Sequence, residues 1–185
     1  MRKIIIVILS LFILSGCATV PPLNFSVPNV GVSNHKIDAE LKSITVSLAR
    51  PDEQKGDISA GMEEIPQFWK SSVEEALNTM AIFTDSGKKK ASLSIKILAI
   101  DIPVFGASMT TKAIARYELL DRNNGYVIYT KDVYSSATVP ASYAFYGLIR
   151  ARESTNRAIQ NNISIFLRGL DSLATDSQMS SAGKR

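Results

Sequence analysis

The chain has little of the chemistry on which most enzymes and metal sites depend. Its 185 residues include one cysteine and one histidine. A single cysteine excludes a disulfide within the chain, and one Cys with one His is too few for a zinc, haem or iron–sulfur site built from the usual ligands. A single histidine also argues against Ser-His-Asp or Cys-His catalysis. We therefore expect no catalytic residue, no metal and no non-covalent cofactor.

The excess of positive charge is small. The chain has 21 basic and 17 acidic residues, and Arg2 and Lys3 belong to a segment that we expect to be removed. The remaining 19 basic residues give a net charge of +2, without the strong basic excess typical of nucleic-acid-binding proteins. We expect no nucleic-acid partner. Hydrophobic residues make up 45% of the chain, which is ordinary for one globular domain.

Long apolar runs are also missing. The longest one near the start, Ile4–Leu14, has eleven residues and is interrupted by Ser10, whereas crossing a bilayer takes about 20. It follows a short positive segment and precedes small residues, which is the pattern of a secretory signal peptide. We predict that residues 1–16 are this signal.

The end of the signal, Leu14-Ser15-Gly16-Cys17, resembles the lipobox of bacterial lipoproteins. The resemblance implies cleavage between Gly16 and Cys17, diacylglycerol on the Cys17 thiol and acylation of the new amino terminus. A thiolate is the nucleophile that such a transfer needs, and several acyl chains anchor far more firmly than one. By resemblance to sorted lipoproteins of diderm bacteria, Ala18 after the cysteine favours the periplasmic face of the outer membrane.

A proline-bearing tether is predicted for residues 17–40. Pro21, Pro22 and Pro28 prevent regular helix and favour extended backbone. His35 in this segment is expected to be solvated. Some of the tether could still lie along the domain as an edge strand, because it carries the apolar residues Val20, Leu23, Phe25, Val27 and Val30.

A single domain is expected over residues 41–174, with an α+β fold in the order β-α-β-β-β-α. Alternation of apolar and polar residues predicts strands, a 3.6-residue period predicts helices, and Asn124-Gly125 predicts a hairpin turn. We expect an antiparallel or mixed sheet of about four strands with two helices on one face. Residues 175–185 are small and polar and predict a disordered tail. The predicted elements are strands 44–48, 92–102, 111–120 and 126–134, and helices 65–80 and 148–173.

A lipobox followed by a domain with the element order β-α-β-β-β-α resembles two groups of small periplasm-facing lipoproteins. These are the YajG-like proteins and the auxiliary lipoproteins of ABC-type lipid transport systems. The similarity is carried by the helix ending in Ala76-Leu77, the strand Leu93-Ser94-Ile95 and the segment Arg116–Asp121 before the Asn-Gly turn. It implies an accessory or binding role at the envelope without enzyme chemistry. The resemblance implies no particular site residues in this chain.

A second resemblance concerns residues 18–50, beginning Ala18-Thr19-Val20-Pro21-Pro22. They look like a small lipoprotein group that sometimes bears the name UDP-N-acetylglucosamine acyltransferase. Enzymes of that name resemble hexapeptide-repeat β-helices with a catalytic histidine. This chain has no hexapeptide period, and its histidine lies in the tether. An acyltransferase-type enzyme is therefore only a remote alternative.

Aromatic and basic residues gather before and at the start of the last helix. Such mixtures are common at protein interfaces and at membrane interfaces, although the aromatic rings could instead pack against the sheet. Our leading hypothesis is a non-enzymatic, lipid-anchored envelope lipoprotein that binds a partner protein or envelope lipid. The alternative is a lipid-binding module with an apolar groove between helices and sheet. The candidate contact residues are Tyr143, Phe145, Tyr146, Arg150 and Arg152.

Overall fold

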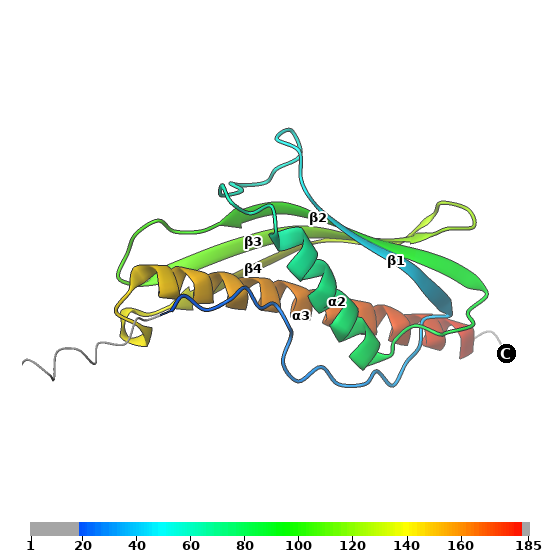
Figure 1. Ribbon diagram of the computed structural model, residues 1–185. Helices are drawn as coiled ribbons and strands as arrows, with labels where there is room; N and C mark the ends of the chain where they lie inside the picture. Colours follow the sequence, from blue (N-terminus) through cyan, green and yellow to red (C-terminus); the bar gives the residue numbers. More distant parts are fainter. Residues whose placement is uncertain (1–18, 183–185) are drawn as a thin grey trace, which may run out of the picture.

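A four-stranded sheet forms one layer of the fold, and two helices cover one of its faces (Figure 1). A computed structural model describes residues 19–182, so the predicted signal peptide, its cleavage site and Cys17 lie outside the described residues. The predicted α+β class and the order β-α-β-β-β-α are confirmed. The elements are β1 (Ala39–Leu48), α2 (Ile65–Met80), β2 (Lys89–Asp101), β3 (Met109–Asp121), β4 (Val127–Val139), the 3-10 helix η2 (Ala141–Tyr143) and α3 (Gly147–Ala182).

The sheet is mixed, with the strand order β1-β2-β3-β4. β1 runs parallel to β2, and α2 makes the crossover that a parallel pair requires. The other neighbours are antiparallel. The predicted hairpin joins β3 to β4, with Gly125 at φ +76°, a conformation that glycine adopts without strain.

The core lies between the sheet and the two helices. Alternate residues of β2, Leu93, Ile95 and Ile97, are buried as their pattern predicted. α2 contributes Trp69 and α3 contributes Phe166, both with no exposed surface. This apolar burial is the main source of stability for the two layers.

A chain of buried hydrogen bonds runs through this core. Trp69 Nε1 donates to the Tyr117 hydroxyl at 3.2 Å, and that hydroxyl donates to Asn162 Oδ1 at 2.9 Å. Asn162 Nδ2 in turn donates to the Val133 carbonyl at 3.0 Å. Burial raises the pKa of the Tyr117 hydroxyl, which keeps its proton available for donation. Four elements are thereby joined, namely α2, β3, α3 and β4.

The N-terminal arm, residues 19–36, is docked on the domain and forms no strand (Figure 1). Phe25 is only 1% exposed, and its ring lies 6.4 Å from that of Trp69. The Asn24 main-chain N–H donates to Asn156 Oδ1 at 3.1 Å, while Asn156 Nδ2 donates to the Pro22 carbonyl at 3.1 Å. Part of the predicted tether is therefore a fixed strap along α3.

The end of α3 corrects the prediction of a disordered tail from residue 175, because the helix continues to Ala182. No glycine or proline stands between Gly169 and Gly183, so nothing local ends the helix. Ala174 is buried, and Thr175 Oγ1 lies 3.2 Å from Nδ1 of His35. His35, expected to be solvated, is half-buried at this contact. The small polar composition of residues 175–185 suggested disorder because composition carries no information about contacts with distant residues such as His35.

Candidate functional site

The sheet face opposite the helices carries a cluster of ion pairs. Asp132 Oδ1 accepts from Arg116 Nε at 2.7 Å, and Asp132 Oδ2 accepts from Lys55 Nζ at 2.5 Å. Chiefly because of the Arg116 hydrogen bond, the pKa of Asp132 is lowered to about 2. Beside it, the hydrogen bond from Lys96 lowers the pKa of Glu53. Carboxylates held so firmly in the ionised form are poorly suited to general acid–base catalysis near neutral pH.

No obvious catalytic or metal centre stands out in the described part of the chain. Across residues 19–182, no group of three or more His, Cys, Asp or Glu side chains is arranged to hold a metal ion. The same residues include no helix long and apolar enough to cross a membrane. The expectation of a protein without metal or non-covalent cofactor stays a prediction.

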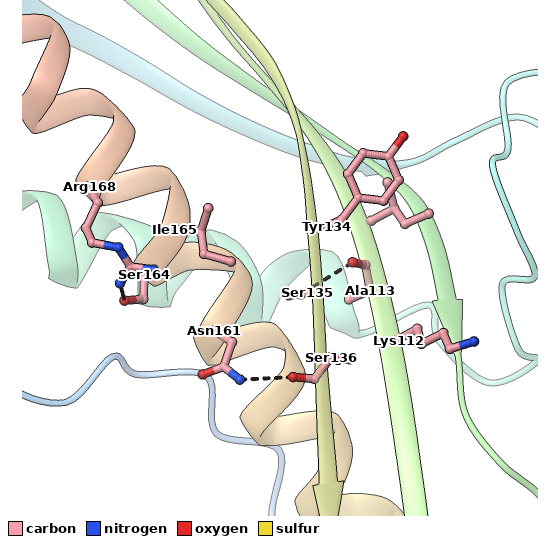
Figure 2. A pocket seen from close by; sticks show the side chains of 10 residues that line it. Lys112, Ala113, Tyr134, Ser135, Ser136, Asn161, Ser164, Ile165 and Arg168 are labelled. Carbon is pink, nitrogen blue, oxygen red and sulfur yellow. Dashed lines mark hydrogen bonds between the residues drawn. The ribbon is translucent and has the colours of Figure 1, made fainter.

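A hollow of about 530 Å³ follows the β4 edge of the sheet (Figure 2). Lys112 projects from β3 on one side of β4, and Arg168 lies on α3 on the other side. Their charged groups therefore do not converge on a single point. The lining residues are Lys112, Ala113, Ile114, Tyr134, Ser135, Ser136, Asn161, Ser164, Ile165 and Arg168.

The polar groups of this hollow largely bond to one another. Asn161 Nδ2 donates to the Ser136 carbonyl at 3.1 Å, and Arg168 Nη1 donates to Ser164 Oγ at 2.8 Å (Figure 2). The lining includes no carboxylate, and the ion pairs of the described residues include neither Lys112 nor Arg168. The β4 edge is thus a positively charged surface without a convergent active site.

The predicted aromatic contact residues lie at one end of the molecule, which we call the apolar end. Tyr143 is 46% exposed, Tyr146 53% and Phe145 fully exposed, so packing against the sheet does not account for these rings. Whether they contact a partner or lipid stays a prediction. The apolar end is defined by Val104, Phe105, Tyr143, Phe145, Tyr146 and Leu148.

Arg150 corrects the prediction of an exposed contact, because only 8% of it is exposed. Its Nη1 donates to the carbonyls of Ala144 at 2.5 Å and Phe145 at 2.8 Å, and its Nη2 donates to the Gly106 carbonyl at 3.0 Å. Arg150 therefore holds the β2–β3 loop beside the segment before α3. The other predicted contact, Arg152, is half-buried.

Sequence reasoning missed two residues of the apolar end, Val104 and Phe105. They are 92% and 87% exposed in the loop that Arg150 holds. A detectable signal was the absence of charge, since residues 102–111 and 133–149 contain no Asp, Glu, Lys or Arg. Such stretches are unusual for solvent-facing loops and indicate an interaction surface.

An apolar cavity of about 170 Å³ lies just inside this end. It is smaller than the roughly 300–1,000 Å³ typical of small-molecule sites. The centre of the interface between helices and sheet is filled by side chains such as Trp69 and Phe166. A hollow of about 550 Å³ between α2 and β1 has the polar side chains of Lys36, Glu40 and Asp85 in its lining. The geometry therefore does not favour the alternative of an internal lipid-binding groove. The cavity lining includes Leu23, Met62, Ile65, Ile102, Leu148 and Arg152.

The class of protein is given by the start of the chain. Residues 1–18 match the family model described as the prokaryotic membrane lipoprotein lipid attachment site. The chain is therefore a lipoprotein by its attachment site, and membrane anchoring follows from it. Cleavage after Gly16 and acylation of Cys17 stay predictions.

Solved structures of similar fold include protein XCC0632 from Xanthomonas campestris, of family DUF330. It has 12% identity and a TM-score of 0.53, and the match covers 88% of this chain and 97% of that one. Hypothetical protein CT253 from Chlamydia trachomatis is similar at 11% identity and a TM-score of 0.50, covering 74% and 98%. A putative lipoprotein from Caulobacter crescentus has 14% identity and a TM-score of 0.45, and the match covers 71% of this chain and 90% of that one. The first two likenesses show the fold alone.

No curated protein matches the sequence significantly. The finer resemblance to YajG-like proteins or ABC-transport auxiliary lipoproteins thus stays a prediction, as does the absence of enzyme activity.

Proposed function

We propose that this protein is a non-enzymatic, lipid-anchored accessory lipoprotein at the periplasmic face of the outer membrane, which binds a protein partner along the free edge of β4. The attachment site at residues 1–18 supports the anchor. Ala18 after the cysteine supports the outer membrane. The lack of convergence between Lys112 and Arg168 in Figure 2 supports a binding surface over a reaction centre.

The β4 edge is suited to an extended polypeptide. Within residues 19–182, β4 is the last strand of the sheet, and one of its edges has no neighbouring strand there. Edge strands offer main-chain N–H and C=O groups to an added strand. In β4 the carbonyls of Val133 and Ser136 already accept hydrogen bonds from α3, so pairing would use the remaining main-chain groups. The second half of β4, residues 133–139, has none of the charged residues or prolines that commonly block such pairing.

The positive charge of this edge is the observation that carries the proposal. Lys112 and Arg168 flank the hollow of about 530 Å³, and the lining has no carboxylate to balance them. Complementary charge steers association and fixes register. The partner segment is therefore expected to be extended and acidic.

Site-specific photo-crosslinking in native envelopes tests this proposal. A photoreactive amino acid replaces Tyr134, which is 59% exposed on β4, or Tyr126, which is 74% exposed beside the β3–β4 turn. We expect one envelope protein to crosslink from position 134 and not from position 126. The crosslink should be lost when Lys112→Glu and Arg168→Glu are introduced together.

The matched control reverses two exposed charges that do not line the hollow, Lys88→Glu and Arg122→Glu. This control changes the net charge equally and should leave the crosslink intact. Equal crosslinking from positions 134 and 126, or equal loss in both charge-reversed variants, would contradict the proposal.

A further inference from the structure

The docked arm leaves little free chain between the lipid attachment site and the body of the domain. Pro22 is fixed by the hydrogen bond that its carbonyl accepts from Asn156. Pro22 is five positions after Cys17, and five residue steps reach at most about 18 Å when fully extended. The anchor must therefore lie close to the part of the domain from which the arm emerges.

The arm emerges at the apolar end. Asn24 and Pro22 bond to Asn156 of α3, whereas Ser33 Oγ bonds to Asp171 at 2.5 Å. The arm therefore runs in the same direction as α3, and its start points back toward the first turn of the helix. In Figure 1 the blue start of the arm lies beside the yellow start of α3.

Two loops from distant parts of the chain build the surface at this end. The β2–β3 loop contributes Val104 and Phe105, and the segment before α3 contributes Phe145 and Tyr146. Arg150 joins the two loops through three main-chain carbonyls. The exposed side chains are therefore held together as one apolar surface by a buried cation.

The composition of the surface matches the headgroup region of a bilayer. Aromatic side chains are enriched there because their rings prefer the boundary between water and hydrocarbon. The runs 102–111 and 133–149 carry no charge, so no charged residue within these loops has to lose water on entering the interface.

We propose that the apolar end is a second membrane contact, with Phe105 and Phe145 seated in the lipid interface next to the acylated Cys17. This inference rests on the lipid anchor of the proposed function but not on the β4 partner. It sets the orientation of the protein. α3 spans about 54 Å at 1.5 Å per residue, and it would point away from the membrane with the β3–β4 turn at the far end.

Depth-dependent fluorescence quenching on the full-length lipidated protein tests this orientation. Cys17 is the only natural cysteine, and the proposed anchor blocks its thiol. Phe105→Cys or Phe145→Cys therefore supplies a single free thiol for an environment-sensitive label. Asn124→Cys, exposed in the opposite β3–β4 turn, is the matched control. Each protein is reconstituted into phosphatidylethanolamine–phosphatidylglycerol vesicles with or without brominated acyl chains.

We expect roughly a twofold loss of label fluorescence at positions 105 and 145 in brominated vesicles, because interfacial groups lie about 5–10 Å deep at the acyl boundary. The label at position 124 should be unchanged. Protein that floats with the vesicles but shows no quenching at 105 or 145 would overturn the orientation and leave the anchor standing. Protein that does not float would overturn the anchor and the orientation together.

Discussion

The buried hydroxyl of Tyr117 donates a hydrogen bond to Oδ1 of Asn162, with 2.9 Å between the two oxygens. This hydrogen bond joins β3, an interior strand of the sheet, to the long helix α3. The Tyr117 ring also stacks on Phe166, with 4.1 Å between ring centroids. A polar contact and an aromatic contact thus fix the same pair of elements. The polar contact specifies which faces meet, because a misplaced helix would leave buried donors and acceptors without partners.

Replacing Tyr117 by Phe should lower the free energy of unfolding by about 1–3 kcal/mol, because the change leaves Asn162 Oδ1 and Trp69 Nε1 buried without this partner. Urea denaturation at pH 7 measures the loss. Tyr126→Phe removes a hydroxyl from an exposed side chain and is the control; its effect should stay within about 0.5 kcal/mol. An equal stability of Tyr117→Phe and the wild type would refute the role of the hydrogen bond.

Asp132→Asn should make the free energy of unfolding vary less with pH in the acid range. The pKa of Asp132 is lowered from near 3.8 to about 2, chiefly by the Arg116 hydrogen bond. Its charge therefore contributes stability above the unfolded pKa, and this contribution is lost as pH falls from about 3.8 toward 2. After allowance for solvent screening we expect a deficit on the order of 1 kcal/mol at pH 7.

The measurement is denaturant unfolding of both proteins at pH 7 and at several acid values. The difference between them should shrink as the wild-type Asp132 becomes protonated. A deficit of constant size down to pH 2 would show that the carboxylate charge is not responsible.

Gly169 is needed where α3 crosses Tyr129. A Cβ at this position would lie 2.7 Å from the Tyr129 hydroxyl oxygen but 3.7 Å from the ring carbon that bears it. That hydroxyl is buried, and no hydrogen-bond partner for it is present among the described residues. Gly169→Ala should therefore destabilise the wild type through a clash with a single oxygen atom.

In a Tyr129→Phe background the same substitution should stabilise the protein by up to about 1 kcal/mol, because alanine is the better helix former. A double-mutant cycle by thermal or urea denaturation checks this reversal of sign. Additive effects of the two substitutions would contradict the clash.

Phe25→Ala should release the N-terminal arm. The side chain is 1% exposed and lies against the rings of Phe68 and Trp69, and truncations of buried Phe commonly cost about 3–5 kcal/mol. Limited trypsin digestion should cut faster after Lys36. Val32→Ala, at a position 70% exposed in the same arm, is the control and should leave the cleavage rate unchanged.

Cys17→Ser should move the protein from the membrane fraction to the soluble fraction, because serine cannot accept the thioether-linked lipid that the lipobox implies. Fractionation with mass spectrometry of the amino-terminal peptide measures both location and acylation. A Cys17→Ser protein that remains in membranes would show that another attachment is sufficient.

The local pattern of the sequence determined much of the fold. The alternation at Leu93, Ile95 and Ile97 places every second residue on one side of a strand, and the Asn-Gly pair allows a tight turn between β3 and β4. The predicted bounds of the first helix, Ile65 and Met80, are those of α2. These features depend on neighbours in the chain, and the sequence carries that information directly.

The tertiary structure alone decided the features that depend on distant contacts. The arm docks through Asn24 and Asn156, which are 132 residues apart, and the apolar end forms because Arg150 reaches the carbonyl of Gly106. An arginine among aromatics suggests an exposed contact when read locally. Its burial follows only from three carbonyls that the fold brings to one place, where they replace hydrogen bonds that Nη1 and Nη2 would otherwise make to water.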